Sequence, residues 1–504
     1  MLFAPHSAFF PQRVAKFFPV RGKIRVTADT AICFHEYEEL IVVDSKNSYD
    51  LVILGGGTAG YSAAIRASQL DMKVALIERD KVGGTCLHRG CIPTKALLHV
   101  AEIAHSVRDS KSFGILSEFH GVDMEAAIKF KDGIVDRNYK GLSGMIKADG
   151  VDLISGEAKL KDQSTVTVST DEGELELNAK NIILATGSEP KTIGIEIGGR
   201  VLTSTEALSH TEVPGSAIVL GGGVIGCEFA SIWSSLGSEV TIVEGLPRLV
   251  ANEDADISKE LEKAFRRRKI KSKLGVKFKS VEQDDNGVKV QLEDGSELEA
   301  DVLLVAVGRG PVTADFGYEE AGIKLDRGFV VTNERLHTGV GNIWAIGDIV
   351  PGLQLAHRSF GHGIFVAEEI AGLEPTPVDE NGVPRATYSE PEIFSVGLTE
   401  DQAKEKYGED KIASVKFPLG GNAKSAILKT NGFVKAVRVK EGPVVGLCGI
   451  GARFSEQVGE AQLIINWEAF PEEVAHLIHG HPTQNEAIGE AMLALAGKPL
   501  HFHN

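Results

Sequence analysis

The chain has 504 residues, with 53 Lys and Arg against 70 Asp and Glu, so its formal net charge is −17. This acidic balance argues against a protein that wraps nucleic acid, and the 5 cysteines are too few for a disulfide-stapled secreted scaffold. No window approaches the ~18 consecutive apolar residues of a membrane-spanning helix, while the 43% apolar content can build the cores of several globular domains.

Residues 1–47 differ from the rest of the chain. The first 28 residues carry five basic side chains and no acid. A secretory signal would need a longer uninterrupted apolar core than this stretch contains. The composition fits an organelle transit peptide, but we favour a disordered leader or a start codon assigned too far upstream. The ordered protein is expected to begin near Ser48.

The first nucleotide-binding unit is predicted from a glycine cluster that directly follows a short apolar strand. Strand, glycine loop, helix and second strand are expected at residues 50–54, 55–60, 61–70 and 73–78. In this G-x-G-x-x-G pattern, Gly55 permits a tight turn, Gly57 lets the backbone approach a pyrophosphate, and Gly60 lets the helix pack closely. The helix N-terminus then faces the phosphates. Glu78 ends the second strand, where a carboxylate can accept hydrogen bonds from ribose hydroxyls.

A second unit of the same kind begins 166 residues later. Its strand, loop, helix end and second strand are expected at residues 216–220, 221–226, 236 and 239–244. Gly221, Gly223 and Gly226 repeat the three glycine roles. Glu244 follows Gly221 by 23 residues, the same spacing as in the first unit. A glycine-rich turn in an ordinary parallel sheet would not explain the repeated acid, so two dinucleotide sites are predicted.

Two dinucleotide sites in one chain suggest a flavin and a nicotinamide. Glu244 would repel a 2′-phosphate, so the nicotinamide should be NAD rather than NADP. Arg248 lies four residues further on and weakens this inference slightly. The cofactors expected from the two units are therefore FAD and NAD.

Two cysteines follow the first unit in the segment GGTCLHRGCIPTK, residues 83–95. Cys86 and Cys91 open an expected helix, and a bend between them would bring them close enough to bridge. The helix N-terminus, with Arg89 and Lys95 nearby, favours a thiolate. Two unrelated buried thiols or half of a metal site are the alternatives. A zinc site would need two more ligands at matched spacing, and no metal site is predicted.

With these motifs the chain resembles the class I pyridine nucleotide–disulfide oxidoreductases, whose redox-active segment looks like residues 83–95. Further motifs of this family follow in order at residues 185–187, 307–309, 346–348, 388–392, 396–400 and 479–486. The resemblance covers residues 49–500. It implies an α/β fold with two Rossmann-like nucleotide-binding domains, a central region and a C-terminal α+β dimerisation domain.

Within the family, the resemblance is greatest to the members that oxidise dihydrolipoamide. Glutathione reductases usually carry arginines at the position of Glu244, mercuric reductases carry a vicinal cysteine pair near the C-terminus, and some quinone reductases have lost the active cysteines. This chain shows none of these features. One departure is His88-Arg89 between the cysteines, where Asn and a small apolar residue are common. It makes the local charge more positive, which bears on the reduction potential and on substrate approach.

The resemblance implies that electrons pass from dihydrolipoamide to a Cys86–Cys91 disulfide, then to FAD and finally to NAD. Cys86 would exchange with the substrate sulfur, and Cys91 would lie against the isoalloxazine ring. Lys95 would approach the flavin, paired with Glu228, whose compatible alternative role is to stabilise a helix N-terminus. The other implied cofactor-binding residues are Gly187, Gly308, Ala356 and, at the flavin ribityl chain, Gly347 and Asp348.

The C-terminal His481 and Glu486 resemble the acid–base pair of the family. Histidine suits proton exchange with a thiol near neutral pH, and Glu486 would hold the imidazole tautomer and stabilise its cation. A surface or structural histidine is the usual alternative, but the HPTQNE context favours catalysis; His479 is a weaker candidate. In the family this histidine comes from the partner subunit, so a homodimer is implied.

The domains expected from these motifs are a leader, an FAD domain, an NAD domain, a central domain that completes the FAD site and a dimerisation domain, at 1–47, 48–197, 198–316, 317–384 and 385–504. The implied partners are a second copy and a dihydrolipoyl acyltransferase or lipoyl carrier protein, with no nucleic acid and no membrane. The expected location is the cytoplasm, or the mitochondrial matrix if the source is eukaryotic and the leader is a transit peptide. The alternatives are another NAD(P)H-dependent disulfide or quinone reductase of the family, or a flavin-binding interaction protein without disulfide turnover.

Overall fold

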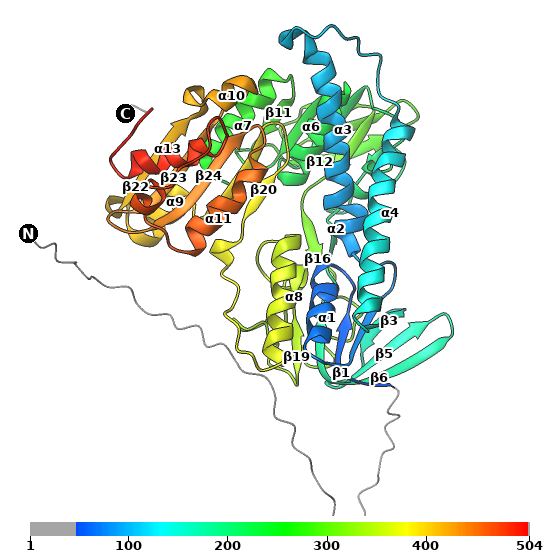
Figure 1. The fold of residues 1–504 in the computed structure, drawn as a ribbon. Helices are drawn as coiled ribbons and strands as arrows, with labels where there is room; N and C mark the ends of the chain where they lie inside the picture. The colour runs from blue at the N-terminus through cyan, green and yellow to red at the C-terminus, as the bar shows by residue number, and fades with distance from the viewer. Residues whose placement is uncertain (1–46, 502–504) are drawn as a thin grey trace, which may run out of the picture. The chain divides into compact units, whose positions relative to one another are not determined.

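The computed structural model describes residues 47–501, so the expected leader lies outside the described residues except for Asn47. Three large sheets organise the described part of the chain (Figure 1). Two of them contain the predicted nucleotide-binding units, and the third is formed by the C-terminal residues. The expected α/β class, with two Rossmann-like units and a C-terminal α+β part, is confirmed.

The first sheet has seven strands in the spatial order β3-β2-β1-β6-β5-β4, with β19 also paired to β6. The strands are β1 (Ser48–Leu54), β2 (Val74–Glu78), β3 (Asp152–Ser155), β4 (Glu157–Leu160), β5 (Thr165–Thr170), β6 (Gly173–Leu184) and β19 (Ile343–Ala345). β1 pairs in parallel with β2 and β6, and its apolar run is buried because helices cover the sheet. Two of them, α1 (Thr58–Gln69) and α8 (Ala356–Ile370), lie side by side (Figure 1).

The second sheet has five parallel strands in the order β11-β10-β9-β15-β8. They are β8 (Val201–Leu202), β9 (Ser216–Leu220), β10 (Glu239–Glu244), β11 (Lys271–Leu274) and β15 (Val302–Val305). α6 (Val224–Leu236) follows β9 and is buried on most sides. A short antiparallel pair of β7 (Ser188–Pro190) and β16 (Arg309–Pro311) joins the two nucleotide-binding units.

The cysteine segment connects the two units. α2 (Gly84–Arg89) ends at Gly90, whose backbone (φ −147°, ψ −112°) breaks the helix, and α3 (Cys91–Asp109) begins at the second cysteine. The chain therefore bends between the cysteines, as expected. α3 packs against α6 and against α4 (Met124–Ala148), which places the start of α3 between the first and second sheets.

The third sheet is antiparallel, in the order β20-β21-β24-β23-β22. Its strands are β20 (Arg385–Thr387), β21 (Glu392–Gly397), β22 (Ile412–Pro418), β23 (Phe433–Val439) and β24 (Val444–Gly451), and it packs against α11 (Val458–Asn466) and α13 (Glu486–Leu495). The buried Lys435 of β23 lies 2.9 Å from Asp254, at the N-cap of α7 (Ala255–Arg267), and 2.7 Å from Glu400. The contact with Asp254 attaches the C-terminal sheet to the second unit, whereas Glu400 belongs to the C-terminal part itself.

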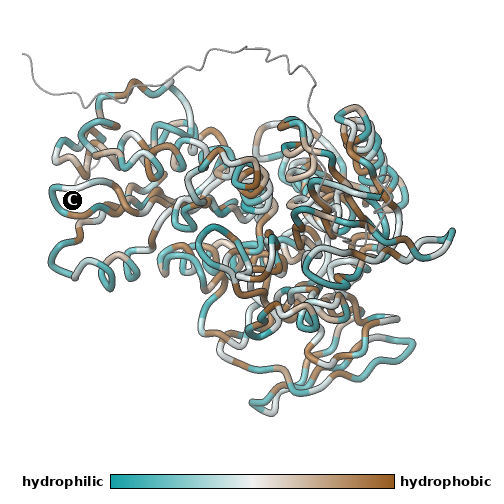
Figure 2. The backbone as a smooth tube through the Cα atoms, turned by 90° about the horizontal axis from the view of Figure 1, so that it is seen from below, coloured by the Kyte–Doolittle hydropathy of each residue, from teal (hydrophilic) through white to brown (hydrophobic). Residues whose placement is uncertain are grey.

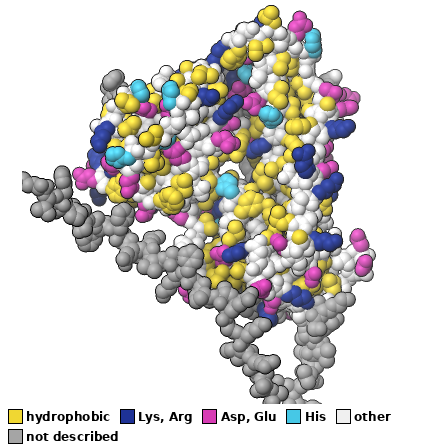
Figure 3. Space-filling model, viewed as in Figure 1, with side chains coloured by type: hydrophobic (Ala, Val, Ile, Leu, Met, Phe, Trp, Pro, Cys, Tyr) yellow, Lys and Arg dark blue, Asp and Glu magenta, His cyan; other side chains and the backbone are white. Residues whose placement is uncertain are grey.

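The apolar stretches of the sequence are buried as expected, but one predicted helix starts at an earlier residue. Figure 2 shows hydrophobic stretches gathered in the interior, where the strands and their covering helices meet. Figure 3 shows acidic and basic side chains interspersed over the visible face, so the net negative charge forms no single acidic field there. The helix expected at residues 61–70 begins earlier, at Thr58, because Gly60 takes part in its first turn. Within residues 47–501, no helix has the length and apolarity needed to cross a membrane.

Candidate active site

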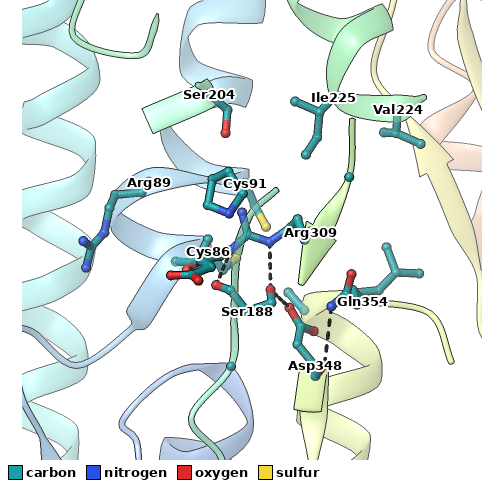
Figure 4. Close-up of a pocket in the computed structure, with 18 of the residues that line it drawn as sticks. Cys86, Arg89, Cys91, Ser188, Ser204, Val224, Ile225, Arg309, Asp348 and Gln354 are labelled. Carbon is teal, nitrogen blue, oxygen red and sulfur yellow. Dashed lines mark hydrogen bonds between the residues drawn. The ribbon is translucent and has the colours of Figure 1, made fainter. Parts of the chain in front are cut away.

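A cavity of ≈ 1350 Å³ lies between the two glycine loops, the cysteine segment and the start of the C-terminal sheet. Its lining includes these expected cofactor-binding residues: Gly55, Gly57, Glu78, Lys95, Gly187, Gly221, Gly223, Glu244, Gly308, Asp348 and Ala356. Cys86, Cys91 and Glu228 also line it. Figure 4 shows Cys86, Cys91, Arg309, Ser188 and Asp348 close together in one part of this cavity. The structure thus brings both nucleotide units and the cysteine pair to one space.

The first glycine loop has little room where it packs and is open where it faces the cavity. A Cβ at Gly55, where φ is +103°, would lie 2.4 Å from the carbonyl oxygen of Ala185, and one at Gly60 would lie 1.8 Å from that of Gly55. A Cβ at Gly57 would meet nothing within 4 Å. The carboxylate of Glu78 accepts hydrogen bonds from the N–H groups of Gly56 and Asp80, each at 2.8 Å. This acid therefore also fixes the loop.

The second loop repeats this geometry closely. A Cβ at Gly221, where φ is +110°, would lie 2.3 Å from the Ala306 carbonyl oxygen, and one at Gly226 would lie 1.9 Å from that of Gly221, whereas Gly223 faces open space. The carboxylate of Glu244 accepts from the N–H groups of Gly222 at 2.6 Å and Leu246 at 2.7 Å. The equal spacing in the sequence therefore corresponds to equal placement of both acids.

The donor groups at both loops fit dinucleotide phosphates. Gly57 and Gly223 are the N-cap residues of α1 and α6, and neither helix has a side chain that caps its first N–H groups. Uncapped N–H groups at a helix N-terminus attract anions, and here they border the cavity directly after N-cap residues that lack a side chain. FAD at the first loop and NAD at the second are compatible with this arrangement.

The two cysteines differ in their proton affinity. Both are half-buried free thiols. A hydrogen bond from Cys86, supported by the positive charge of Lys95, lowers the pKa of Cys91 to about 7, although burial acts in the opposite direction. The same hydrogen bond, together with burial, raises the pKa of Cys86. Cys91 is thus the better thiolate, and hence the better leaving group in thiol–disulfide exchange.

The residues between the cysteines do not point their charge at the sulfur atoms. His88 Nε2 lies 2.9 Å from the Val82 carbonyl oxygen, and its ring packs edge-on against Tyr139. Arg89 donates to Asp80 at 2.6 Å and extends away from Cys91 (Figure 4). The expectation that Arg89 favours the thiolate is therefore wrong, because Asp80 neutralises it; Lys95 is the cation that acts on Cys91.

Lys95 and Glu228 form an ion pair beside Cys91, in which the carboxylate is buried and the ammonium is half-buried. The Lys95 Nζ lies 2.9 Å from both carboxylate oxygens, and Glu228 is 2% exposed. Burial lowers the pKa of Lys95, but the Glu228 carboxylate outweighs burial, so the pKa is raised overall. Tyr388 was not expected here: its N–H donates to Glu228 at 3.0 Å, and its ring centre lies 4.5 Å from the Lys95 Nζ. Glu228 lies in the second turn of α6, so its partner is Lys95 rather than the helix N-terminus.

A polar chain that links Arg309 to Asp348 was missed in the sequence. Arg309 Nε donates to Ser188 Oγ at 2.8 Å, and Ser188 Oγ donates to Asp348 Oδ2 at 2.5 Å (Figure 4). Burial lowers the pKa of the Arg309 guanidinium. Gly347, which precedes Asp348, has φ +75°, and a Cβ there would lie 3.0 Å from that of Ala59. Arg309 is the last residue of the family motif at 307–309 and Ser188 directly follows the one at 185–187, which was the available signal.

His481 and Glu486 form a dyad that is absent from the cavity lining. His481 Nδ1 lies 2.7 Å from Glu486 Oε1, and the Thr483 N–H donates to Glu486 Oε2 at 2.7 Å. Burial raises the pKa of Glu486, but the Thr483 and His481 contacts outweigh it and lower the pKa overall. The His481 side chain is 72% exposed. His479 instead lies 2.8 Å from Glu460 and is half-buried, so it is engaged elsewhere.

No candidate metal site is seen in the described residues: among residues 47–501, no three or more His, Cys, Asp or Glu side chains are grouped to hold a metal ion. The two cysteines lie next to Lys95 and Glu228, which form an ion pair with each other. The geometry of the segment is therefore that of a dithiol beside a cation.

Comparisons with protein families cover most of the chain. The family described as pyridine nucleotide-disulphide oxidoreductase matches residues 49–363, and the dimerisation domain of this family matches residues 383–492. The chain is 40% identical over 472 residues to a dihydrolipoyl dehydrogenase of Bacillus subtilis, covering 90% of this chain and 99% of that protein. It is 40% identical over 466 residues to the mitochondrial dihydrolipoyl dehydrogenase 1 of Arabidopsis thaliana, covering 90% and 91%.

Two solved structures have a fold similar to that of this chain. LpdA from Mycobacterium tuberculosis superimposes with a TM-score of 0.83 at 26% identity, over 88% of this chain and 99% of that one. The HOCl-induced flavoprotein disulfide reductase RclA from Escherichia coli, solved as a Cu(II) complex, superimposes with a TM-score of 0.80 at 30% identity, over 89% and 100%.

Proposed function

This chain belongs to the pyridine nucleotide-disulphide oxidoreductases, and from that premise we propose that it reoxidises protein-bound dihydrolipoamide to lipoamide with NAD as the electron acceptor. The main observation in its support is that the Cys86–Cys91 pair lines the same cavity as two glycine loops, each of which is bonded by a glutamate. Relatives at 40% identity bear the name dihydrolipoyl dehydrogenase. The chain is therefore a flavin-dependent, NAD-linked oxidoreductase that acts on sulfur groups.

FAD and NAD are the cofactors, and each glycine loop would bind one of them. When bound, FAD supplies a two-electron acceptor for a dithiol and a hydride donor for NAD. The FAD-binding residues would be Gly55, Gly57, Gly60, Glu78, Lys95, Gly187, Gly347, Asp348 and Ala356. The NAD-binding residues would be Gly221, Gly223, Gly226, Glu244 and Gly308. Glu244 excludes a 2′-phosphate because a second anion would face its carboxylate.

The cysteines carry out the exchange with substrate. A dihydrolipoamide thiolate attacks Cys86 of the disulfide, forms a mixed disulfide and releases Cys91 as a thiolate. The second substrate thiolate then attacks the substrate sulfur of the mixed disulfide and releases Cys86, so lipoamide leaves with its disulfide closed and the enzyme holds the dithiol. The pKa of Cys91, at about 7, makes it a good leaving group, and the Lys95–Glu228 pair stabilises the charges beside it.

His481 would accept the substrate thiol proton, with Glu486 holding the imidazole. Glu486 is already fixed by the Thr483 N–H, so it can orient Nδ1 and leave Nε2 for the substrate. Because the dyad does not line the cavity of its own chain, we place it in the site of a second copy. The match of residues 383–492 to a dimerisation domain supports a homodimer.

The finer assignments follow from this function. The domains would be the leader at 1–47, the FAD domain at 48–197, the NAD domain at 198–316, the central domain at 317–384 and the dimerisation domain at 385–504. The central domain contributes β19 to the first sheet and α8 to the helices that cover it. The lipoyl group would come from a dihydrolipoyl acyltransferase or lipoyl carrier protein. The location would be the cytoplasm, or the mitochondrial matrix in a eukaryotic source.

The decisive test is steady-state NADH formation from dihydrolipoamide by the purified protein, with NADP in place of NAD as the control. We expect rapid formation with NAD and little with NADP. Parallel assays of NADH oxidation by low-molecular-weight disulfides and by quinones separate the other activities of the family. Faster turnover of a quinone or another disulfide than of lipoamide would refute the proposed substrate.

A further inference from the structure

A buried arginine and a buried histidine on α8 bond the two backbone polar groups of Gly347, the residue that precedes Asp348. The Gly347 N–H donates to His362 Nδ1 at 3.3 Å, and Arg358 Nη1 donates to the Gly347 carbonyl oxygen at 3.3 Å. His362 is 1% exposed and Arg358 is 3% exposed. Both backbone polar groups of Gly347, which belong to the two peptide groups on either side of its Cα, are therefore fixed by side chains of a single helix.

The bonds of Arg358 are concentrated on the loop that follows Asp348. Its Nη2 donates to the Pro351 carbonyl oxygen at 2.6 Å, and its Nη1 also reaches the Leu353 carbonyl oxygen at 3.3 Å. Its charge is balanced by Glu380, to which Nε donates at 2.7 Å. A purely structural role would not need this pattern, since well-packed apolar side chains stabilise a core at least as well as a buried ion pair.

α8 is itself fixed on the helix of the first glycine loop. A Cβ at Gly363, next to His362, would lie 2.2 Å from Ser62 Oγ and 2.5 Å from the Ala59 carbonyl oxygen of α1. The helix that carries Arg358 and His362 therefore packs on α1, whose N-cap is Gly57. Asp348, which follows Gly347, lines the cavity and accepts a hydrogen bond from Ser188. The packed helices α1 and α8 thus contact both the first glycine loop and the segment that contains Gly347 and Asp348.

We propose that His362 and Arg358 are positioning residues that fix the backbone of Gly347 and so hold the Asp348 carboxylate where FAD binds. This inference rests on the proposed function only for the identity of the flavin. His362 acts through its unprotonated Nδ1, because only a lone pair can accept from the Gly347 N–H. Arg358 acts through its donors to the loop carbonyls. Neither residue lines the part of the cavity that would contact substrate, and neither is a catalytic residue.

The surroundings of His362 keep it neutral. The charged groups that face it are Arg358 of α8, Glu380 of the short helix η4 (Glu380–Gly382) and Asp348 of the short helix η3 (Gly347–Ile349). Its Nε2 lies 3.7 Å from Glu380 Oε1. Burial lowers the pKa of His362, and the nearby carboxylates only partly oppose it. The acceptor is therefore present at neutral pH and is lost as the pH falls and the imidazole takes up a proton.

The test compares two substitutions of His362 in the full-length protein. His362→Asn keeps an acceptor at the place of Nδ1, whereas His362→Leu fills a similar volume without one. After FAD is removed, its rebinding is measured by flavin fluorescence with no substrate present, and apoprotein melting temperatures are measured in parallel. We expect His362→Leu to raise the Kd of FAD roughly 5–100-fold, because a buried N–H loses its partner. His362→Asn should stay within about threefold of wild type.

A matched control lies on the same helix. Ile364 is 43% exposed, and Ile364→Asn should leave FAD binding unchanged. The proposal is overturned if His362→Leu binds FAD like wild type, or if His362→Asn loses as much affinity as His362→Leu. Because binding is measured without substrate, a protein that holds FAD but fails to oxidise dihydrolipoamide would contradict the proposed function and leave this test intact.

A second measurement covers the case in which His362→Leu does not fold. FAD retention is followed as the pH is lowered, for wild type and for His362→Asn. Wild type should release FAD as His362 becomes protonated, and His362→Asn should retain it to lower pH because an amide has no such proton to take up. Identical acid release by both proteins would overturn the proposal.

Discussion

Glu228 and Glu486 are both carboxylates that hold a basic partner, yet they belong to regions of opposite character. Glu228 is 2% exposed and binds Lys95 and the Tyr388 N–H within the cavity. The partner of Glu486, His481, is 72% exposed and lies outside the cavity lining. The cavity is complete within one chain, whereas the dyad is preorganised but has no reacting sulfur in its own chain beside it. Under the proposed function, cofactor binding would be a property of one chain, whereas substrate turnover would require two.

The largest expected effect comes from a substitution in the exposed His481–Glu486 dyad. His481→Gln should lower dihydrolipoamide turnover by about 10²–10⁴-fold, the usual contribution of a general acid–base group. FAD content should stay at the wild-type level, because no contact of His481 reaches the cavity. Turnover is measured by NADH formation and FAD by absorbance of the purified protein. Near-normal turnover would rule out the acid–base role.

Mixed dimers test whether His481 of one chain acts in the cavity of the other. Cys91→Ser removes the cavity thiol and His481→Gln removes the exposed base, so each homodimer should be nearly inactive. If the base serves the partner's cavity, a mixed dimer keeps one intact site out of two. Random reassociation of equal amounts should then restore about a quarter of wild-type activity in the symmetric dimer. If the dyad acted within its own chain, no intact site would form, and the absence of recovery after verified subunit exchange would refute the two-chain site.

Within the cavity, the two glycine loops offer a second contrast because their geometry is nearly the same and their cofactors differ. Gly57→Val should weaken FAD binding, and Gly223→Val should raise the KM for NAD, each by roughly 10–100-fold if the added side chain costs about 1–3 kcal/mol. FAD titration of the apoprotein and NAD saturation curves measure the two effects. Loss of FAD from Gly223→Val would contradict the division of the loops. The Cβ position is open at both residues, so apoprotein melting temperatures should change little.

Much of this site could be predicted because it depends on short stretches of sequence. Each glycine loop, its helix and its acid are adjacent along the chain, and backbone clearance alone demands glycine at Gly55, Gly60, Gly221 and Gly226. The bend between Cys86 and Cys91 is also local, since Gly90 breaks the helix. Local sequence was therefore enough for the loops and for the cysteine segment.

The remaining contacts depend on how distant segments meet. Arg89 was assigned to the thiolate from its position beside the cysteines, but its side chain turns to Asp80, nine residues away. Tyr388 reaches Glu228 across 160 residues. His362 and Gly347 are 15 residues apart, but only the placement of α8 on α1 makes them partners. Side-chain direction and the docking of helices are tertiary properties, and no spacing rule in the sequence specifies them.

The smallest expected effect concerns how the two cysteines differ inside the cavity. The hydrogen bond from Cys86 is the main cause that lowers the pKa of Cys91 to about 7, and the charge of Lys95 comes after it. Cys86→Ala should therefore raise the pKa of Cys91 by about 1 unit or more toward that of an ordinary thiol, and Lys95→Met should raise it by less. The measurement is the pH dependence of iodoacetamide alkylation of Cys91 in the reduced protein, read by mass spectrometry. In the reduced wild type, the thiolate fraction of Cys91 falls as the pH drops through 7, and the alkylation rate should fall with it because only the thiolate reacts. A larger pKa shift from Lys95→Met than from Cys86→Ala would show that the ion pair, rather than the neighbouring thiol, controls the proton affinity of Cys91.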